Sequence, residues 1–288
     1  PVAEPEPGAE PAAPEMEALR AENVDAGAYL AARIAESRND FQAATAWYGK
    51  AILSDSGNAR LLEGAILAEL GTGDLALAIE AAGRLKALGG EPSQLAEVAL
   101  LADQAQREDY TAILASIEAG SPLGDLVTKL VGAWAKVGEG KMSEALDAFD
   151  SITKTKGLEA FGFYHKALAL ASVGDFEGAD EILSGRAAGP IFVMRRGVFA
   201  HAEILSQLER NADALDLLDR SFGTDPDPLV DALRLRLEAG EPVPFETVRT
   251  ARDGIAEVFY SVGTALNRDA DPVYTPVSYT HLRAHETK

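Results

Sequence analysis

Apolar residues recur along most of the chain at the three- and four-residue spacing of an amphipathic α-helix, as at Phe163, Ala167 and Leu170. The apolar blocks are about 13 residues long, and short polar turns separate them. Each turn leads into an apolar residue and, a few positions later, an alanine. The pattern predicts an all-α fold of successive helix pairs. Its clearest occurrences are NDFQAATAWYGKA (39–51), GDLALAIEAAGRL (73–85) and GDFEGADEILSGR (174–186).

Alignment of the blocks on that alanine gives a repeat of about 34 residues, with successive spacings of 34, 34, 33, 34 and 35. Antiparallel helices approach closely only where small side chains lie between them. We therefore expect each alanine to pack against the first helix of its own repeat. The alanines are Ala44, Ala78, Ala112, Ala145, Ala179 and Ala214. Their expected partners are Ala32, Ala133, Ala167 and Ala202, with Ile66 and Leu100 in the second and third repeats.

Two polar residues form each expected turn between helices. Glycine accepts the left-handed backbone that a tight turn needs, and Asp or Asn caps the helix that follows. Five prolines fall near the end of an expected second helix, which agrees with this repeat frame because proline cannot continue a helix. The turns are Asn39-Asp40, Gly73-Asp74, Arg107-Glu108, Gly140-Lys141, Gly174-Asp175 and Glu209-Arg210. The prolines are Pro92, Pro122, Pro190, Pro226 and Pro228.

The period and its motif residues resemble the tetratricopeptide repeat (TPR) family. Repeat one (25–58) carries the family pattern at Ala32, Asn39-Asp40-Phe41, Ala44, Tyr48 and Ala51. Repeat five (160–193) carries it at Ala167, Gly174-Asp175-Phe176 and Ala179. Repeat three (93–126) departs most, with Ser116 at the aromatic position. The resemblance implies a right-handed solenoid of stacked antiparallel helix pairs, with six repeats over residues 25–228.

Beyond residue 228 the repeat pattern loosens. Residues 229–276 predict a continuing helical region, with helices over 229–239 and 245–267 separated by GEPVP. We expect the native protein to continue past this region, so that the second helix exposes an apolar face and promotes self-association through this end. The residues of that face are Ile255, Val258, Phe259, Val262 and Leu266.

Both ends of the chain differ from the repeats. Residues 1–24 are rich in Pro, Ala and Glu, which predicts a disordered leader. Residues 277–288 contain VSYTHLRAHET, which resembles one reading frame of the adapter used in transposase-based DNA sequencing libraries. We therefore expect a non-native tail. His281 and His285 have a helical metal-ligand spacing but belong to this tail.

The chain is strongly acidic, with 26 Lys+Arg, 46 Asp+Glu and a formal net charge of −20. Such a surface repels phosphate groups, which argues against nucleic acid and anionic membranes as partners. The absence of cysteine excludes disulfides and thiolate chemistry. No stretch approaches the ~18 consecutive apolar residues of a membrane-spanning helix. We expect neither a cofactor nor a metal.

Three patterns resemble catalytic motifs, but helix structure explains each of them better. Residues 71–76 match G-x-G-x-x-[G/A], yet a helix precedes them where a nucleotide site needs a strand. Residues 151–154 match S-x-x-K without its companion motifs. His165 and His201 lie on expected first helices, where packing or lining the groove is a simpler role than catalysis. The sequence predicts a protein without enzymatic activity.

In the TPR family, ligands lie along fixed positions of each first helix, which line a concave groove. Repeats four to six place aromatic residues beside Arg196, and both residue types are enriched at binding hot spots. An apolar or amphipathic peptide suits such a groove. The alternative is that several of these aromatics pack against the neighbouring repeat. The predicted peptide-binding residues are Tyr29, Arg33, Arg60, Trp134, Phe161, Tyr164, Arg196 and Phe199.

The resemblance favours a protein–protein interaction scaffold that binds a protein or peptide in this groove. The alternative is the docking or regulatory region of a longer enzyme whose catalytic domain lies beyond residue 276. The Ala-, Gly- and Asp-rich composition and the adapter-like tail indicate a bacterial protein. Bacterial relatives of this kind serve in assembly, often in the cell envelope, so a periplasmic location is preferred over a cytoplasmic one.

Overall fold

A computed structural model describes residues 26–187, 189, 194–223 and 227–269 of the chain. Over these residues the structure consists of α-helices and the turns between them, without a β-strand. The predicted all-α fold of successive packed helix pairs is confirmed. The expected leader over 1–24 and the expected tail over 277–288 lie outside the described residues.

The chain divides into two compact units, residues 1–100 and 101–288. In the first unit, helix 41–54 packs against helix 59–72, and helix 59–72 packs against helix 75–88. Small residues such as Ala32 and Ala44 are fully buried there. Beside them the Tyr48 hydroxyl donates a 2.5 Å hydrogen bond to Glu36. The helices of this unit are 26–37, α2 (Phe41–Ser54), α3 (Ala59–Thr72) and α4 (Leu75–Leu88), followed by the start of α5 (Gln94–Gln106).

The second unit continues the same arrangement, because each helix from α6 to α12 contacts the one that follows it. A continuous apolar cluster runs through this unit and includes Trp134, Phe149 and Tyr164. Its helices are α6 (Tyr110–Glu118), α7 (Asp125–Gly138), α8 (Met142–Thr153), α9 (Glu159–Ser172), α10 (Phe176–Leu183), α11 (Arg195–Gln207), α12 (Asn211–Phe222), α13 (Pro228–Glu238) and α14 (Ala251–Asp269).

The turn within each repeat has the backbone that the sequence pattern predicts. One residue of each turn has a positive φ, and half of these residues are not glycine. In four repeats an aspartate follows, and its side chain accepts a hydrogen bond from a backbone N–H of the next helix. Such a cap satisfies one of the free donors at the start of a helix. The positive-φ residues are Asn39, Gly73, Glu108, Gly140, Gly174 and Glu209, and the capping aspartates are Asp40, Asp74, Asp109 and Asp175.

The predicted frame of repeat three is wrong by one residue. Its turn is Glu108-Asp109, because Asp109 and not Glu108 caps α6. Ile113 therefore takes the fully buried position expected for Ala112, and Leu101 takes the place expected for Leu100. The other predicted alanines are all 0% exposed: Ala44, Ala78, Ala145, Ala179 and Ala214.

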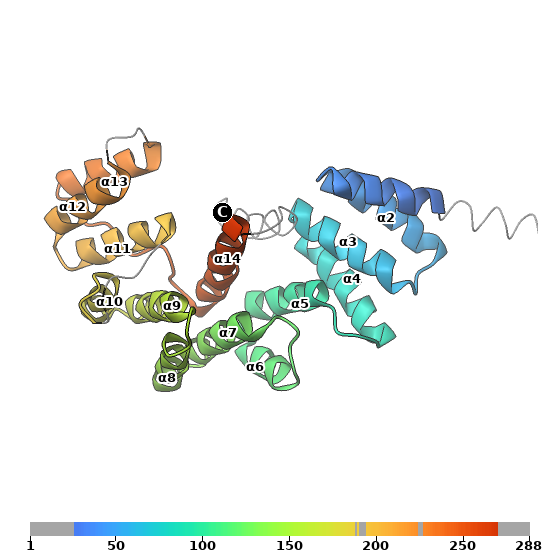
Figure 1. The fold of residues 1–288 in the computed structure, drawn as a ribbon, viewed down its shortest axis with the longest axis horizontal. Coiled ribbons are helices and arrows are strands. Elements are labelled where there is room, and N and C mark those ends of the chain that lie inside the picture. The colour runs from blue at the N-terminus through green and yellow to red at the C-terminus, as the bar shows by residue number, and fades with distance from the viewer. Residues whose placement is uncertain (1–25, 188, 190–193, 224–226, 270–288) are drawn as a thin grey trace, which may run out of the picture. The chain divides into compact units, whose positions relative to one another are not determined.

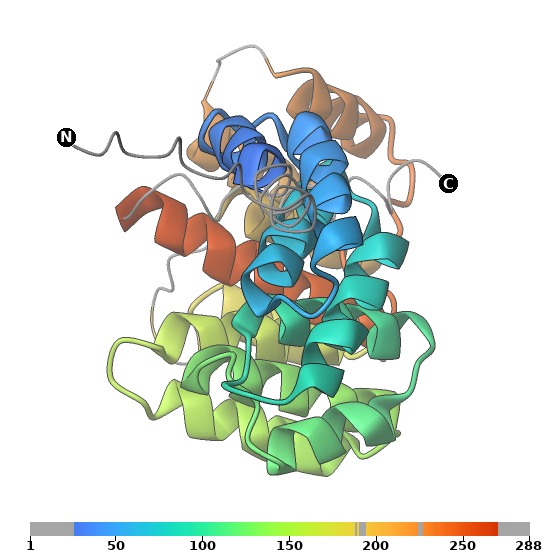
Figure 2. The same ribbon diagram turned by 90° about the vertical axis from the view of Figure 1, so that its right-hand side faces the viewer.

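Helix α14 departs from the helix-pair pattern. Its main contacts are with α7 and α9, and not with α13, which precedes it in the chain. In Figure 1 and Figure 2, α14 is the red helix lying against the green α7 and α9. It begins at residue 251 and not at 245 as predicted, because Thr250 and Asp253 cap each other's backbone N–H groups at that point. Residues 241–250 are non-helical.

The expected exposed apolar face of this last helix is also wrong. Ile255 and Val258 are 2% and 0% exposed, and Phe259 and Val262 pack against the main cluster of the second unit. Only Leu266, at 55%, is largely exposed among the residues named for that face. The helix folds back onto α7 and buries the face there.

Candidate functional site

The predicted peptide-binding residues of the first unit lie at its surface. Arg33 forms a 2.8 Å ion pair with Glu36, and its side chain is 54% exposed. Arg60 is exposed, and Tyr29 is half-buried against the small apolar cluster of this unit. Between them these side chains offer two guanidinium groups and one aromatic ring.

The five predicted residues of the second unit lie in different surroundings. Trp134, Tyr164 and Arg196 contact the last part of the chain, as described below. Phe161 is half-buried against the main apolar cluster. Phe199 lies elsewhere, with its ring 5.7 Å from that of Phe222, in the cluster formed around α11, α12 and α13.

We call the side chains of α7, α9 and α11 that hold the last part of the chain the docking face. The part that they hold, residues 243–266, is the docked segment. The docking face consists of Trp134, Tyr164, His165, Arg196, Glu203, Ser206 and Gln207.

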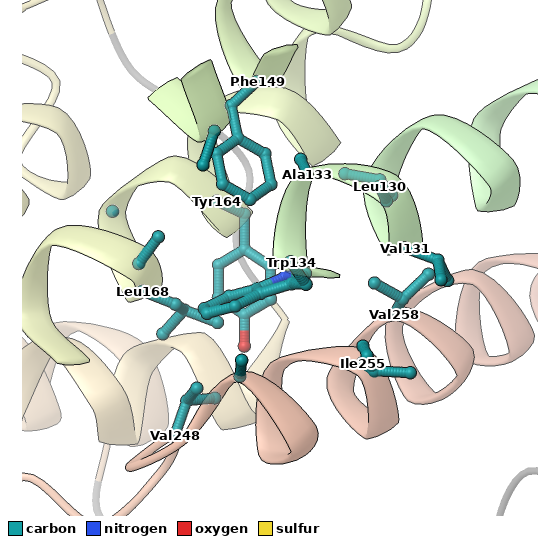
Figure 3. Packing of buried hydrophobic residues seen from close by; sticks show 14 of the residues in the cluster. Leu130, Val131, Ala133, Trp134, Phe149, Tyr164, Leu168, Val248, Ile255 and Val258 are labelled. Carbon is teal, nitrogen blue, oxygen red and sulfur yellow. The ribbon is translucent and has the colours of Figure 1, made fainter. Parts of the chain in front are cut away.

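The apolar part of the docking face centres on Trp134, which is fully buried. Gly254 of α14 lies directly against the indole, where an added Cβ would be 2.2 Å from Trp134 Cδ2. Figure 3 shows Ile255 and Val258 pointing from α14 toward Val131 on α7. Only glycine fits at position 254, and its absent side chain lets α14 approach α7 closely.

A chain of hydrogen bonds crosses from α7 through α9 to α14. Trp134 Nε1 donates to His165 Nδ1 over 3.0 Å, so the proton of a neutral imidazole is on Nε2. His165 Nε2 then donates to Ser261 Oγ over 3.0 Å, and Ser261 donates to the Val258 carbonyl. Burial lowers the pKa of His165 to about 3, which keeps the ring neutral. The histidine connects buried polar groups and is not placed as a general base.

Glu257 of α14 is a buried carboxylate with two partners on the docking face. It accepts a 2.8 Å hydrogen bond from the Tyr164 hydroxyl and a 2.6 Å one from Arg196 Nε. Burial raises the pKa of Glu257, while the charge of Arg196 and the hydrogen bonds oppose that shift. Losing Arg196 would leave this buried carboxylate without its counter-charge, which is strongly destabilising.

The non-helical part of the docked segment is held through its backbone. Ser206 accepts from the Val243 N–H at 3.0 Å, and Gln207 donates to the Val243 carbonyl at 2.7 Å. One carboxylate oxygen of Glu203 accepts from the N–H groups of Glu246 and Thr247. Arg196 donates to the Thr247 carbonyl over 3.2 Å. Side chains of α11 thus bind an extended stretch of backbone, as peptide-binding proteins do.

A second polar cluster surrounds the buried Asp180 and joins α10, α11 and α12. His201 lies 2.7 Å from this carboxylate, and Arg186 and Arg210 each lie 2.6 Å from it. Burial would raise the pKa of Asp180, but the hydrogen bonds from these three partners outweigh burial and lower it. The three partners connect α10, α11 and α12 through this single carboxylate.

No group of three or more His, Asp or Glu residues in the described part of the chain is placed to hold a metal ion. Within the same residues, no helix has the length and hydropathy needed to cross a membrane.

The sequence predicted Trp134, Tyr164 and Arg196 as binding residues and gave His165 a packing or groove-lining role. It missed Ser206 and Gln207, which lie one helical turn beyond Glu203, the last groove position that the family resemblance implies on this helix. The signal available in the sequence lay in the docked segment, because Glu257 and Ser261 are polar residues within the apolar stripe of the last helix.

Comparison of the chain with protein-family models gives no match, and comparison with curated proteins gives none.

Proposed function

We propose that this chain is a TPR-like scaffold, without enzymatic activity, that binds segments of other proteins through the first helices of its repeats. The observation that supports it is the docking face itself. Side chains on three successive first helices bind a segment far away in the sequence through its backbone, an acidic side chain and an apolar stripe. A surface that holds one segment in this way has the chemistry to hold others.

The predicted groove residues of the first unit are more exposed than those of the second unit, so a partner protein can reach them. In its repeats, Arg33, Tyr29 and Arg60 occupy the same first-helix positions as Trp134, Tyr164 and Arg196, respectively, in the second unit. The two arginines remain exposed. Exposed arginine beside an aromatic ring provides the donors and the apolar surface that anchor a protein ligand. The two guanidinium groups can each pair with a carboxylate of the ligand, while the net charge of −20 opposes a ligand that is acidic overall.

The test is a selection of peptides from a random library against the full chain, followed by binding measurements with variants. We expect enriched peptides that bind the wild-type chain and lose at least about tenfold in affinity for the Arg33→Ala/Arg60→Ala double variant, about 1.4 kcal/mol. Leu53→Ala, at a side chain 86% exposed on α2, is the matched control and should bind normally. Peptides that bind all three chains equally, or no enrichment, would refute the proposal.

A further inference from the structure

We infer that the docking face is a receptor for a helical segment of a partner protein, and that residues 243–266 occupy it as an internal ligand. The inference rests on the proposed function and specifies the ligand: an extended stretch followed by a helix with the order small–apolar–x–Glu–apolar–x–x–Ser. In this chain the order is provided by Gly254, Ile255, Glu257, Val258 and Ser261.

The interface differs from an ordinary helix-packing core, because buried polar groups lie among its apolar side chains. Glu257 is 1% exposed, and Ser261 and His165 are 0% exposed. All three are hydrogen-bonded across the interface. Apolar residues of similar size stabilise a core at least as well, whereas buried paired charges discriminate strongly between correct and incorrect partners. The docking face therefore selects its ligand by matched polar groups as well as by shape.

The docked segment is buried and hydrogen-bonded from Val243 onward, whereas its connection to α13 and its far end are exposed. Residues 238–242, which connect it to α13, are exposed, and Gly240 there has a positive φ of 71°. At the other end the Leu266 side chain is 55% exposed. A segment with an exposed connection and an exposed end separates from its binding face without unfolding the helices beneath.

An attached segment competes at a high effective concentration, of the order of millimolar for a short flexible connection. An external helix with the same contacts therefore binds the wild-type chain far more weakly than it binds a chain whose own segment cannot dock. This difference makes the inference measurable.

The experiment uses the full-length chain with Gly254→Val. The added side chain meets Trp134, so the segment cannot seat, while every residue of the docking face is retained. Gly83→Val is the matched control, because a Cβ there has nothing within 4 Å. The probe is a fluorescein-labelled synthetic peptide of residues 243–266, and the readout is fluorescence anisotropy.

We expect the peptide to bind the Gly254→Val chain at least about 100-fold more tightly than the wild-type or Gly83→Val chains. A peptide with Glu257→Lys should lose this binding, and so should a chain that combines Gly254→Val with Arg196→Ala. A helical Gly254→Val chain that fails to bind, or that binds both peptides equally, overturns the inference. The selection described above, at Arg33 and Arg60, would be unaffected by that failure.

Two further outcomes are decisive. If Gly254→Val prevents folding, amide hydrogen exchange of the milder Glu257→Gln chain is compared with that of the wild type. Faster exchange confined to α14 supports the inference. Equally faster exchange in α7 and α9 overturns it. If the wild-type chain forms a dimer that Gly254→Val abolishes, the occupant is a second copy of this chain, and a distinct partner protein is excluded.

Discussion

Glu69 on α3 is a buried carboxyl group in the first unit, only 8% exposed, and its Oε2 has no hydrogen-bond partner. Burial, with smaller contributions from the charges of Asp74 and Glu80, raises the pKa of Glu69 to about 7. The folded state therefore keeps a proton that the unfolded state loses near pH 4.5. Stability falls as the pH rises from about 4.5 to about 7 and stays reduced above that range.

Replacing Glu69 with glutamine should therefore stabilise the protein at alkaline pH only. We expect Glu69→Gln to raise the free energy of unfolding by roughly 1–3 kcal/mol at pH 8 and to change it little at pH 4.5. Urea unfolding at the two pH values measures this, with the exposed Glu63→Gln on the same helix as the control. An equal gain at both pH values would contradict the argument.

His165 has the opposite dependence on pH. Burial lowers its pKa to about 3. At mildly acid pH the imidazole therefore binds a proton in the unfolded state but not in the folded state. The contribution of His165 is complete above about pH 6.5 and is lost as the pH falls toward 3. Between those values a single such group adds a slope of about 1.4 kcal/mol per pH unit.

The variant His165→Gln separates titration from hydrogen bonding. Glutamine can still accept from Trp134 and donate to Ser261, but it does not titrate. We expect its stability to fall less steeply than that of the wild type between pH 6 and pH 4, while the two differ little at pH 8. The unfolding free energy as a function of pH measures this. Parallel curves would show that His165 takes up no proton on unfolding, which would contradict a lowered pKa in the folded state.

At the scale of the helices, the sequence is most informative where local chemistry decides the structure. Turn residues such as Gly73 and caps such as Asp175 act within four residues of their own position, so the period was predictable from them. The error in repeat three has the same cause. Glu108 and Asp109 both offer a carboxylate, and the choice of Asp109 as the cap shifted the buried position to Ile113.

The docking of α14 could not be predicted in the same way. Its apolar stripe was visible in the sequence, but the partner of Glu257 lies 93 residues away at Tyr164. No local pattern specifies a contact at that distance. The candidate residues Trp134, Tyr164 and Arg196 follow from their repeat positions, whereas the segment that they hold becomes evident only from the three-dimensional structure.

For the whole molecule, the two compact units differ in how their helices are connected. In the first unit the contacts join neighbours along the chain, from α2 to α3 and from α3 to α4. In the second unit α14 adds contacts to α7 and α9, so helices distant in sequence depend on one another. Its buried side chains also include the large rings of Trp134 and Phe149. More buried apolar area and long-range contacts both favour a more stable, more cooperative unit.

The two tryptophans make this difference measurable, because Trp47 belongs to the first unit and Trp134 to the second. In a Trp47→Phe chain, the emission of the fully buried Trp134 reports on the second unit alone, while circular dichroism at 222 nm reports on the helices of both. We expect the helical signal to begin its loss at lower urea than the Trp134 signal, because the first unit unfolds first. Adding Gly254→Val should bring the two transitions together by weakening the second unit. Coincident transitions already in the Trp47→Phe chain would mean that the whole molecule unfolds as one cooperative unit.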